Sequence, residues 1–238
     1  MTGEERTVAQ MRIGRRQLTD EVADHLRTRI MTGDIRPGEF IRLDETASTL
    51  GCSVTPVREA LVTLRGEGLV RSSPHRGFIV ESLERGDLVD IFWMQAELSA
   101  RLATHATADP ELDRHLGELS AILDDLEAAV ARGDAAAVLD QEFAFHRHVN
   151  LMARSKKLAW FLFSANKYSP DQLYATDPEW GRQAVASHRR LIGYLREGDV
   201  TQIRSEVHAR FADARDRLIR SLEVIDFWES DESQVHAS

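Results

Sequence analysis

The fold of the first part of the chain is decided by residues 43–70, LDETASTLGCSVTPVREALVTLRGEGLV. Their periodicity predicts two short helices, 43–50 and 54–66, joined by a tight turn. Ala47 provides the small side chain needed where two helices cross, and Gly51 provides the positive φ of the turn. A shared core follows from the apolar residues Leu43, Leu50, Val54, Val57, Leu61 and Leu64. This spacing is typical of a helix-turn-helix.

The second of these helices would present polar side chains to a partner. Ser53 is placed to cap its N-terminus, and Thr55 and Arg58 stand on its first turns. Side chains at the start of a recognition helix reach base edges in the major groove of DNA. The alternative is a helical hairpin without a nucleic-acid role, in which Arg58 is only a solvated charge.

Elements on both sides extend the motif. Residues 18–32 carry apolar side chains at steps of four and predict an amphipathic helix. Two short β-rich runs around the Pro/Gly turn at 73–77 predict a hairpin. The hairpin would act as a wing whose tip presents His75, Arg76 and Gly77 to the DNA backbone or minor groove.

From about residue 84 the pattern changes to long helical periodicity with few prolines. The predicted helices cover residues 86–107, 110–132, 134–154, 156–166, 180–197 and 199–226. Gly133 and Gly198 mark two of the turns, and each precedes an Asp suited to cap the next helix. Six antiparallel helices of this kind form an all-α bundle.

The charge distribution also indicates two modules. Residues 1–80 hold 12 Arg against 11 acidic residues, whereas the remainder carries the whole acidic excess of a chain with net charge −9. We therefore expect a winged helix-turn-helix domain of α+β class at 12–82. An all-α antiparallel bundle would follow at 83–228, and a disordered tail at 229–238.

Composition excludes several classes of protein. The single cysteine, Cys52, rules out a disulfide framework and fits a reducing compartment. The most apolar uncharged run, 158–166, is far shorter than the roughly 18 residues that a membrane helix needs. The first 17 residues contain no apolar region of a secretory signal. We expect a soluble cytoplasmic protein without a membrane partner.

The motif TPVREAL at 55–61, followed by EGLV and RGFIV, resembles the winged helix-turn-helix of the GntR family of bacterial transcription regulators. The part that begins at ERGDLVDIFWMQAELSARLA resembles that family's FadR-type effector-binding domain, called FCD. Together the resemblance covers about residues 18–222. It implies a homodimer that binds palindromic double-stranded operator DNA.

The resemblance also implies roles for single residues. Thr55 and Arg58 would contact bases or phosphates, and His75 and Gly77 would contact the minor groove. Val54 stands where the family usually has an arginine, so this chain departs from the common half-site contacts.

Polar residues interrupt the apolar faces of the predicted bundle. Glu142 and His146 lie four apart on one helix face, and His188 falls within the apolar stripe of another helix. Arg210 borders the stripe of the last helix and should point inward more than His208 does. Buried charges must be paired or ligated, which leaves three interpretations: a structural polar network, a metal site or a carboxylate pocket.

The family resemblance narrows this choice. Many FCD domains hold a divalent metal such as Zn, Ni or Mn with a carboxylate, a histidine four residues later and two further histidines. Glu142, His146 and His188 match the first three positions, but the fourth is Arg210, whose guanidinium would repel a cation. We expect the positive charge of Arg210 to take the place of the metal ion's charge. Arg210 would pair with Glu142 or bind a carboxylate effector in a bidentate pair. Gln95 stands where the family carries an arginine and is added to the expected effector contacts.

These observations predict a DNA-binding transcription regulator whose operator affinity responds to a small acidic metabolite. One alternative is a metal-dependent helical-bundle enzyme that uses Glu142, His146 and His188, which leaves the winged motif unexplained. Another is a module that has lost effector sensing. The chain has no G-x-S-x-G, H-E-x-x-H or glycine-rich phosphate loop, so we do not expect an enzyme.

Overall fold

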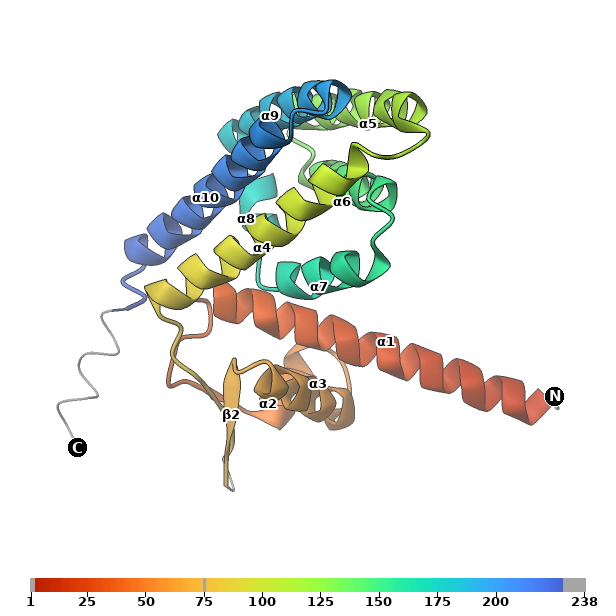
Figure 1. Cartoon of the computed structure of the whole chain (residues 1–238). Coiled ribbons are helices and arrows are strands. Elements are labelled where there is room, and N and C mark those ends of the chain that lie inside the picture. Colours follow the sequence, from red (N-terminus) through yellow and green to blue (C-terminus); the bar gives the residue numbers. More distant parts are fainter. Residues whose placement is uncertain (1–2, 75, 229–238) are drawn as a thin grey trace. The chain divides into compact units, whose positions relative to one another are not determined.

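A computed structural model describes residues 3–74 and 76–228 (Figure 1). The described chain forms two compact units, one of residues up to Glu84 together with those from Ser221 on, the other of Arg85–Arg220. The helices are α1 (Gly3–Met31), α2 (Leu43–Thr49), α3 (Val54–Gly66), α4 (Arg85–Ala106), α5 (Leu112–Arg132), α6 (Ala135–Met152), α7 (Lys156–Asn166), α8 (Asp171–Ala175), α9 (Pro178–Glu197) and α10 (Val200–Val224). The strands are β1 (Phe40–Ile41), β2 (Val70–Ser73) and β3 (Gly77–Val80). His75 and the predicted disordered tail, 229–238, lie outside the described residues.

The predicted helix-turn-helix is present in the first unit as α2 and α3. Gly51 has a φ of +64° in the turn, and the Cys52 amide donates to the Ala47 carbonyl across it at 3.0 Å. Val57, Leu61 and Leu64 are fully buried. The other three residues of the expected core, Leu43, Leu50 and Val54, are only half-buried.

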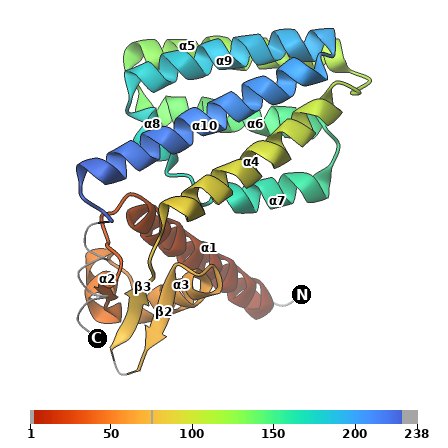
Figure 2. The same ribbon diagram turned by 60° about the vertical axis from the view of Figure 1, so that its left-hand side comes forward.

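The wing is part of a three-stranded antiparallel sheet in the order β1-β3-β2. Figure 2 shows its hairpin of β2 and β3. The predicted hairpin is confirmed, with Val70 opposite Val80 and Ser73 opposite Gly77. The third strand, β1, was not predicted. Its two residues are too few to show the alternation by which a strand is recognised in sequence.

The first helix is longer than its apolar face predicts, because α1 begins at Gly3 rather than near residue 18. It packs on α3 through a buried ion pair. Arg27 is 2% exposed and donates to both carboxylate oxygens of Glu67 at 2.8 Å. Thr19 adds a hydrogen bond of 3.1 Å to Glu59. These contacts fix the helix-turn-helix on α1.

The second unit is the predicted helical bundle. In it α5 packs against α6 and α9, and α4 packs against α6 and α7 (Figures 1 and 2). The turns at Gly133 and Gly198 are confirmed: both glycines are left-handed, with φ of 65° and 67°. Asp134 and Asp199 each accept a backbone hydrogen bond at the start of the next helix. The short helix α8 was not predicted.

The last described residues pack on the first unit. Ile225 and Phe227 lie so close to Gly33 that a Cβ there would come within 2.6 Å and 2.9 Å of their side chains. The Trp228 indole donates to the Leu83 carbonyl at 2.8 Å. The sequence had assigned 221–228 to the helical domain, and these contacts place the segment with the winged unit instead. Among the described residues every helix is too short or too polar to cross a bilayer.

Candidate functional site

The recognition helix α3 presents an unpaired positive charge. Thr55 and Arg58 are exposed on its first turns. Arg58 makes no hydrogen bond or ion pair with another residue of the described chain, so its guanidinium is free to reach a phosphate or a base edge. Ser53 occupies the N-cap position with extended backbone, but its side chain forms no capping hydrogen bond. That leaves the Ser53 hydroxyl available as well.

The structure of the wing explains the glycine at its tip and the position of the arginine beside it. Gly77 has a φ of +101°, and a Cβ there would lie 2.9 Å from the Ile41 carbonyl oxygen. Only glycine therefore allows β3 to approach β1 so closely. Arg76 is exposed, with its guanidinium carbon 6.0 Å above the ring of Phe40. His75, the third residue expected at the tip, lies outside the described residues.

Four polar side chains from three helices of the bundle meet in its interior. Glu142 and His146 come from α6, His188 from α9 and Arg210 from α10. His188 Nε2 lies 2.9 Å from Glu142 Oε1, and since a carboxylate only accepts, the imidazole donates. His146 Nε2 lies 3.3 Å from the other carboxylate oxygen, Oε2, and 2.6 Å from Arg210 Nη1. The same oxygen is 3.8 Å from Arg210.

An ion pair joins α9 to α10, the helix that carries Arg210. Arg190 of α9 forms a bidentate pair with Glu206 of α10, with distances of 2.8 and 2.7 Å. Arg210 then points inward with a side chain 17% exposed. His208 is 34% exposed and lies 3.4 Å from Glu97 instead. This geometry agrees with the prediction from helical phase that Arg210 points inward more than His208 does.

Charges in the cluster are strongly coupled. Burial by itself raises the pKa of Glu142, but the charge of His188, the hydrogen bond that His188 donates and the adjacent His146 imidazole hold that pKa well below its usual range. Burial and the adjacent Arg210 charge lower the pKa of His146 to about 3. His146 is therefore neutral at pH 7 and accepts a hydrogen bond from Arg210. Burial also lowers the pKa of Arg210.

The cluster borders a cavity of about 140 Å³. Glu142, His146 and Arg210 line it, together with Asp171 and Tyr174 of the short helix α8. Desolvation by the packed bundle and the negative charge of Glu142 raise the pKa of Asp171, although the residue is exposed at the edge of the cavity. Sequence reasoning missed both α8 residues. The one available signal was an Asp directly after Pro170, at a helix start.

Two of the residues expected in the pocket lie behind its wall. His188 is fully buried, stacks on Phe145 with ring centres 4.0 Å apart, and reaches the pocket only through Glu142. Gln95 is fully buried and does not line the cavity. Its amide nitrogen donates to the Ala165 carbonyl at 2.8 Å, and its oxygen accepts from Ser169 at 3.3 Å. Gln95 therefore ties α4 to the end of α7 instead of facing the cavity.

The fit of a divalent metal to this cluster can be judged from its donors. Glu142, His146 and His188 offer ligand atoms within 4.8 Å of one another. However, Arg210 donates to the His146 nitrogen that a metal would need, and its buried charge would repel a cation. With Arg210 in this position the set does not fit a metal ion.

Comparisons with known proteins agree with both units. Residues 18–80 match the family of bacterial regulatory proteins called gntR, and residues 90–213 match the FCD domain. An HTH-type transcriptional regulator in an unstable DNA locus of Streptomyces ambofaciens is 30% identical, covering 79% of this chain and 81% of its own. A probable D-xylose utilization operon transcriptional repressor of Paenarthrobacter nicotinovorans is 28% identical, covering 79% and 83%.

Solved structures show the same fold. The E. coli protein McbR/YncC aligns with a TM-score of 0.60 at 23% identity, over 87% of this chain and 97% of that one. The relatives are transcription regulators, so the bundle enzyme considered as an alternative has no support among them. The chain is thus a DNA-binding transcription regulator that belongs to the GntR family of bacterial regulatory proteins and carries an FCD effector-binding domain.

Proposed function

We propose that a small carboxylate metabolite binds in the cavity beside His146 and Arg210 and alters the affinity of a homodimer for palindromic operator DNA. The observation that carries this proposal is the number of unused hydrogen-bond donors on Arg210. Among the described residues its one hydrogen bond goes to His146, so most of its five N–H groups remain available beside the cavity. A carboxylate matches the planar guanidinium in a bidentate pair.

Binding would replace one carboxylate partner of Arg210 by another. Glu142 is 3.8 Å from the guanidinium, which is too far for a direct hydrogen bond, so a ligand can approach Arg210 more closely than Glu142 does. Glu142 keeps its hydrogen bond from His188 while the ligand binds. Asp171 supports an anionic ligand when its carboxyl is protonated, because it then donates rather than repels.

The helix that carries Arg210 also offers a route to the DNA-binding unit. α10 is continuous from the cavity to Val224, and its last residues belong to the winged unit. A displacement of Arg210 would therefore act on a helix whose last residues belong to the winged unit. A coupling of about 1–3 kcal/mol, typical of allosteric proteins, would change operator affinity by 5- to 150-fold.

The test begins with an operator selected from random double-stranded DNA by the full-length protein. Operator affinity is then measured with a panel of small mono-, di- and tricarboxylates. We expect at least one carboxylate to change the affinity about ten-fold or more, and Arg210→Met to abolish this response while retaining DNA binding. Arg132→Met, at an exposed arginine on α5, serves as the matched control.

Two outcomes would contradict the proposal. One is an operator affinity that no carboxylate changes in the wild-type protein. The other is an Arg210→Met protein that responds as strongly as the wild type. Arg58→Ala separates the two functions, since it should weaken operator binding by about 1–3 kcal/mol and leave carboxylate binding unchanged.

A further inference from the structure

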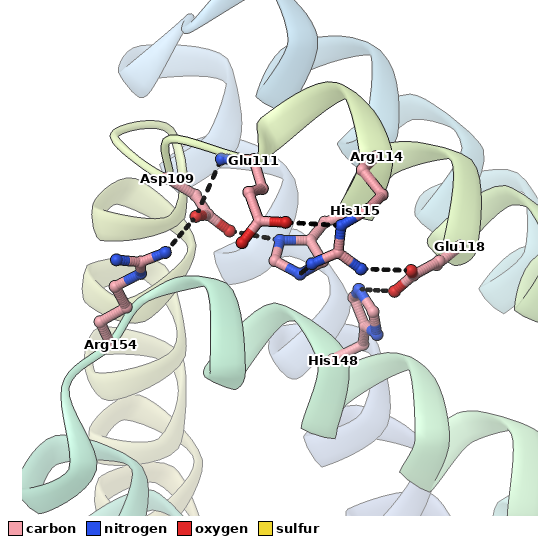
Figure 3. Close-up of polar contacts among 7 residues, drawn as sticks. All are labelled: Asp109, Glu111, Arg114, His115, Glu118, His148 and Arg154. Carbon is pink, nitrogen blue, oxygen red and sulfur yellow. Dashed lines mark hydrogen bonds and ion pairs between the residues drawn. The ribbon is translucent and has the colours of Figure 1, made fainter.

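A second cluster of polar side chains lies outside the cavity, where α5 begins beside the C-terminal half of α6 (Figure 3). We call it the α5–α6 cluster. Its members are Asp109, Glu111, Arg114, His115, Glu118, His148 and Arg154. The proposed carboxylate response uses none of them.

Three members present metal-ligand atoms to one another. His115, Glu118 and His148 each offer one such atom, and all three atoms lie within 4.8 Å. His148 Nε2 is buried and forms no hydrogen bond of good geometry within residues 3–74 and 76–228, although it lies 3.3 Å from Glu118 Oε2. A buried imidazole nitrogen without a hydrogen bond is costly unless something else binds it.

A buried carboxylate orients the second imidazole. Asp109 accepts a hydrogen bond from His115 Nδ1, and its side chain is fully buried. Burial raises the pKa of Asp109, but hydrogen bonds from the Glu111 amide and His115 outweigh this, so it stays ionised. With Nδ1 as donor, His115 Nε2 holds a lone pair. Histidine ligands of metals usually have such a carboxylate behind them.

The guanidinium of Arg114 occupies the space between the ligand atoms of His115 and Glu118. Arg114 Nη2 lies 2.7 Å from His115 Nε2, and Nη1 donates to Glu118 at 2.5 Å (Figure 3). Unlike Arg210 in the cavity, Arg114 is 52% exposed and can rotate into solvent while keeping its pair with Glu111. The cluster contains three carboxylates and two guanidiniums, so its net charge also favours a cation.

We propose that His115, Glu118 and His148 bind a divalent ion of the zinc class, which displaces Arg114. Two imidazoles and one carboxylate are a ligand set typical of Zn²⁺, with water completing four-coordination, and they disfavour Mg²⁺ and Ca²⁺. The bound ion links α5 to α6. It therefore stabilises the bundle in proportion to the logarithm of the free metal concentration.

The test uses the full-length protein without a histidine tag, treated with a chelator and titrated with Zn²⁺. We expect about one equivalent to bind and to raise Tm by about 5–10 °C at a concentration 100-fold above Kd. His115→Ala and His148→Ala should lose this equivalent. His25→Ala, at an exposed histidine in the winged unit, is the matched control and should keep it.

Arg114→Ala tests the proposal through a gain of zinc affinity and not through a loss of zinc binding. Removing the competing charge should tighten Zn²⁺ binding about ten-fold or more, whereas Arg132→Ala, at the other end of α5, should leave it unchanged. The proposal is overturned if the wild-type protein binds no zinc, or if both histidine variants bind it as the wild type does. It is equally overturned if Arg114→Ala binds zinc no more tightly than the wild type.

Discussion

His146 shows how one residue in the cavity depends on its neighbours. Its Nε2 accepts from Arg210, and it can do so only while the imidazole is neutral. Protonation would place a second positive charge beside a buried guanidinium. The lowered pKa of His146 follows from burial and from that charge. Folding therefore favours the neutral imidazole.

This coupling predicts a pH effect on stability. His146 has a pKa of 6.5 in the unfolded chain and of about 3 in the folded chain. Its contribution to the free energy of unfolding is therefore complete above pH 6.5 and is lost as the pH falls toward 3. Between pH 7 and 5 the wild type should lose about 1–2 kcal/mol more unfolding free energy than His146→Gln, whose amide oxygen still accepts from Arg210. Urea unfolding at both pH values measures this, with His25→Gln as control. Equal losses in wild type and His146→Gln would contradict it.

At the scale of elements, α1 and α3 are joined by one buried charge. Arg27 donates twice to Glu67 and once to Asp24. Glu67 directly follows α3, so the pair anchors the recognition helix to the helix before it. Its position also explains how α3 keeps a fixed orientation when its own N-terminus lacks a side-chain cap.

Breaking this pair should destabilise the protein. Arg27→Met removes two hydrogen bonds and an ion pair from Glu67, which is 18% exposed, and should lower the unfolding free energy by about 2–4 kcal/mol. Arg29→Met on the same helix should change it by less than about 1 kcal/mol. Adding Glu67→Gln to Arg27→Met should recover part of the loss, since a neutral amide then replaces the carboxylate that lost the Arg27 charge. The idea fails if Arg27→Met and Arg29→Met unfold at the same urea concentration.

At the scale of the whole molecule, the proposed homodimer needs an apolar face. Helix α7 exposes Trp160, Phe161 and Phe163 by 59%, 56% and 58%. Phe163 lines a groove of about 400 Å³ with Phe143 and Leu151, both more than half exposed. Exposed apolar patches of this kind usually mark an interaction surface. We infer that α7 contributes to the contact between two copies.

The inference predicts the mass in solution. Light scattering should give about twice the chain mass of 26.9 kDa for the wild type and a shift toward one chain mass for Phe163→Asp. Loss of the dimer should also weaken binding to a palindromic operator, because both half-sites are then bound independently. A Phe163→Asp protein that stays dimeric would exclude α7 from the contact.

The sequence by itself determined the helix-turn-helix, the wing hairpin and the bundle. Ala47, Gly51 and Val57 predict the crossing of α2 and α3 because such a turn depends on residues close together in the chain. Helical phase likewise placed Arg210 inward and His208 outward, since periodicity encodes which face of a helix is buried. The departure from a metal-binding set was visible in the identity of Arg210 alone.

Only the tertiary structure decided which of these faces meet and which polar groups remain free. The sequence predicted Gln95 as an effector contact, but packing brings the Ala165 carbonyl and the Ser169 hydroxyl to its amide. The residues of the α5–α6 cluster come from two loops and two helices, so no period in the sequence connects Asp109 with His148. Such contacts depend on how separate elements pack, and local spacing carries no information about that.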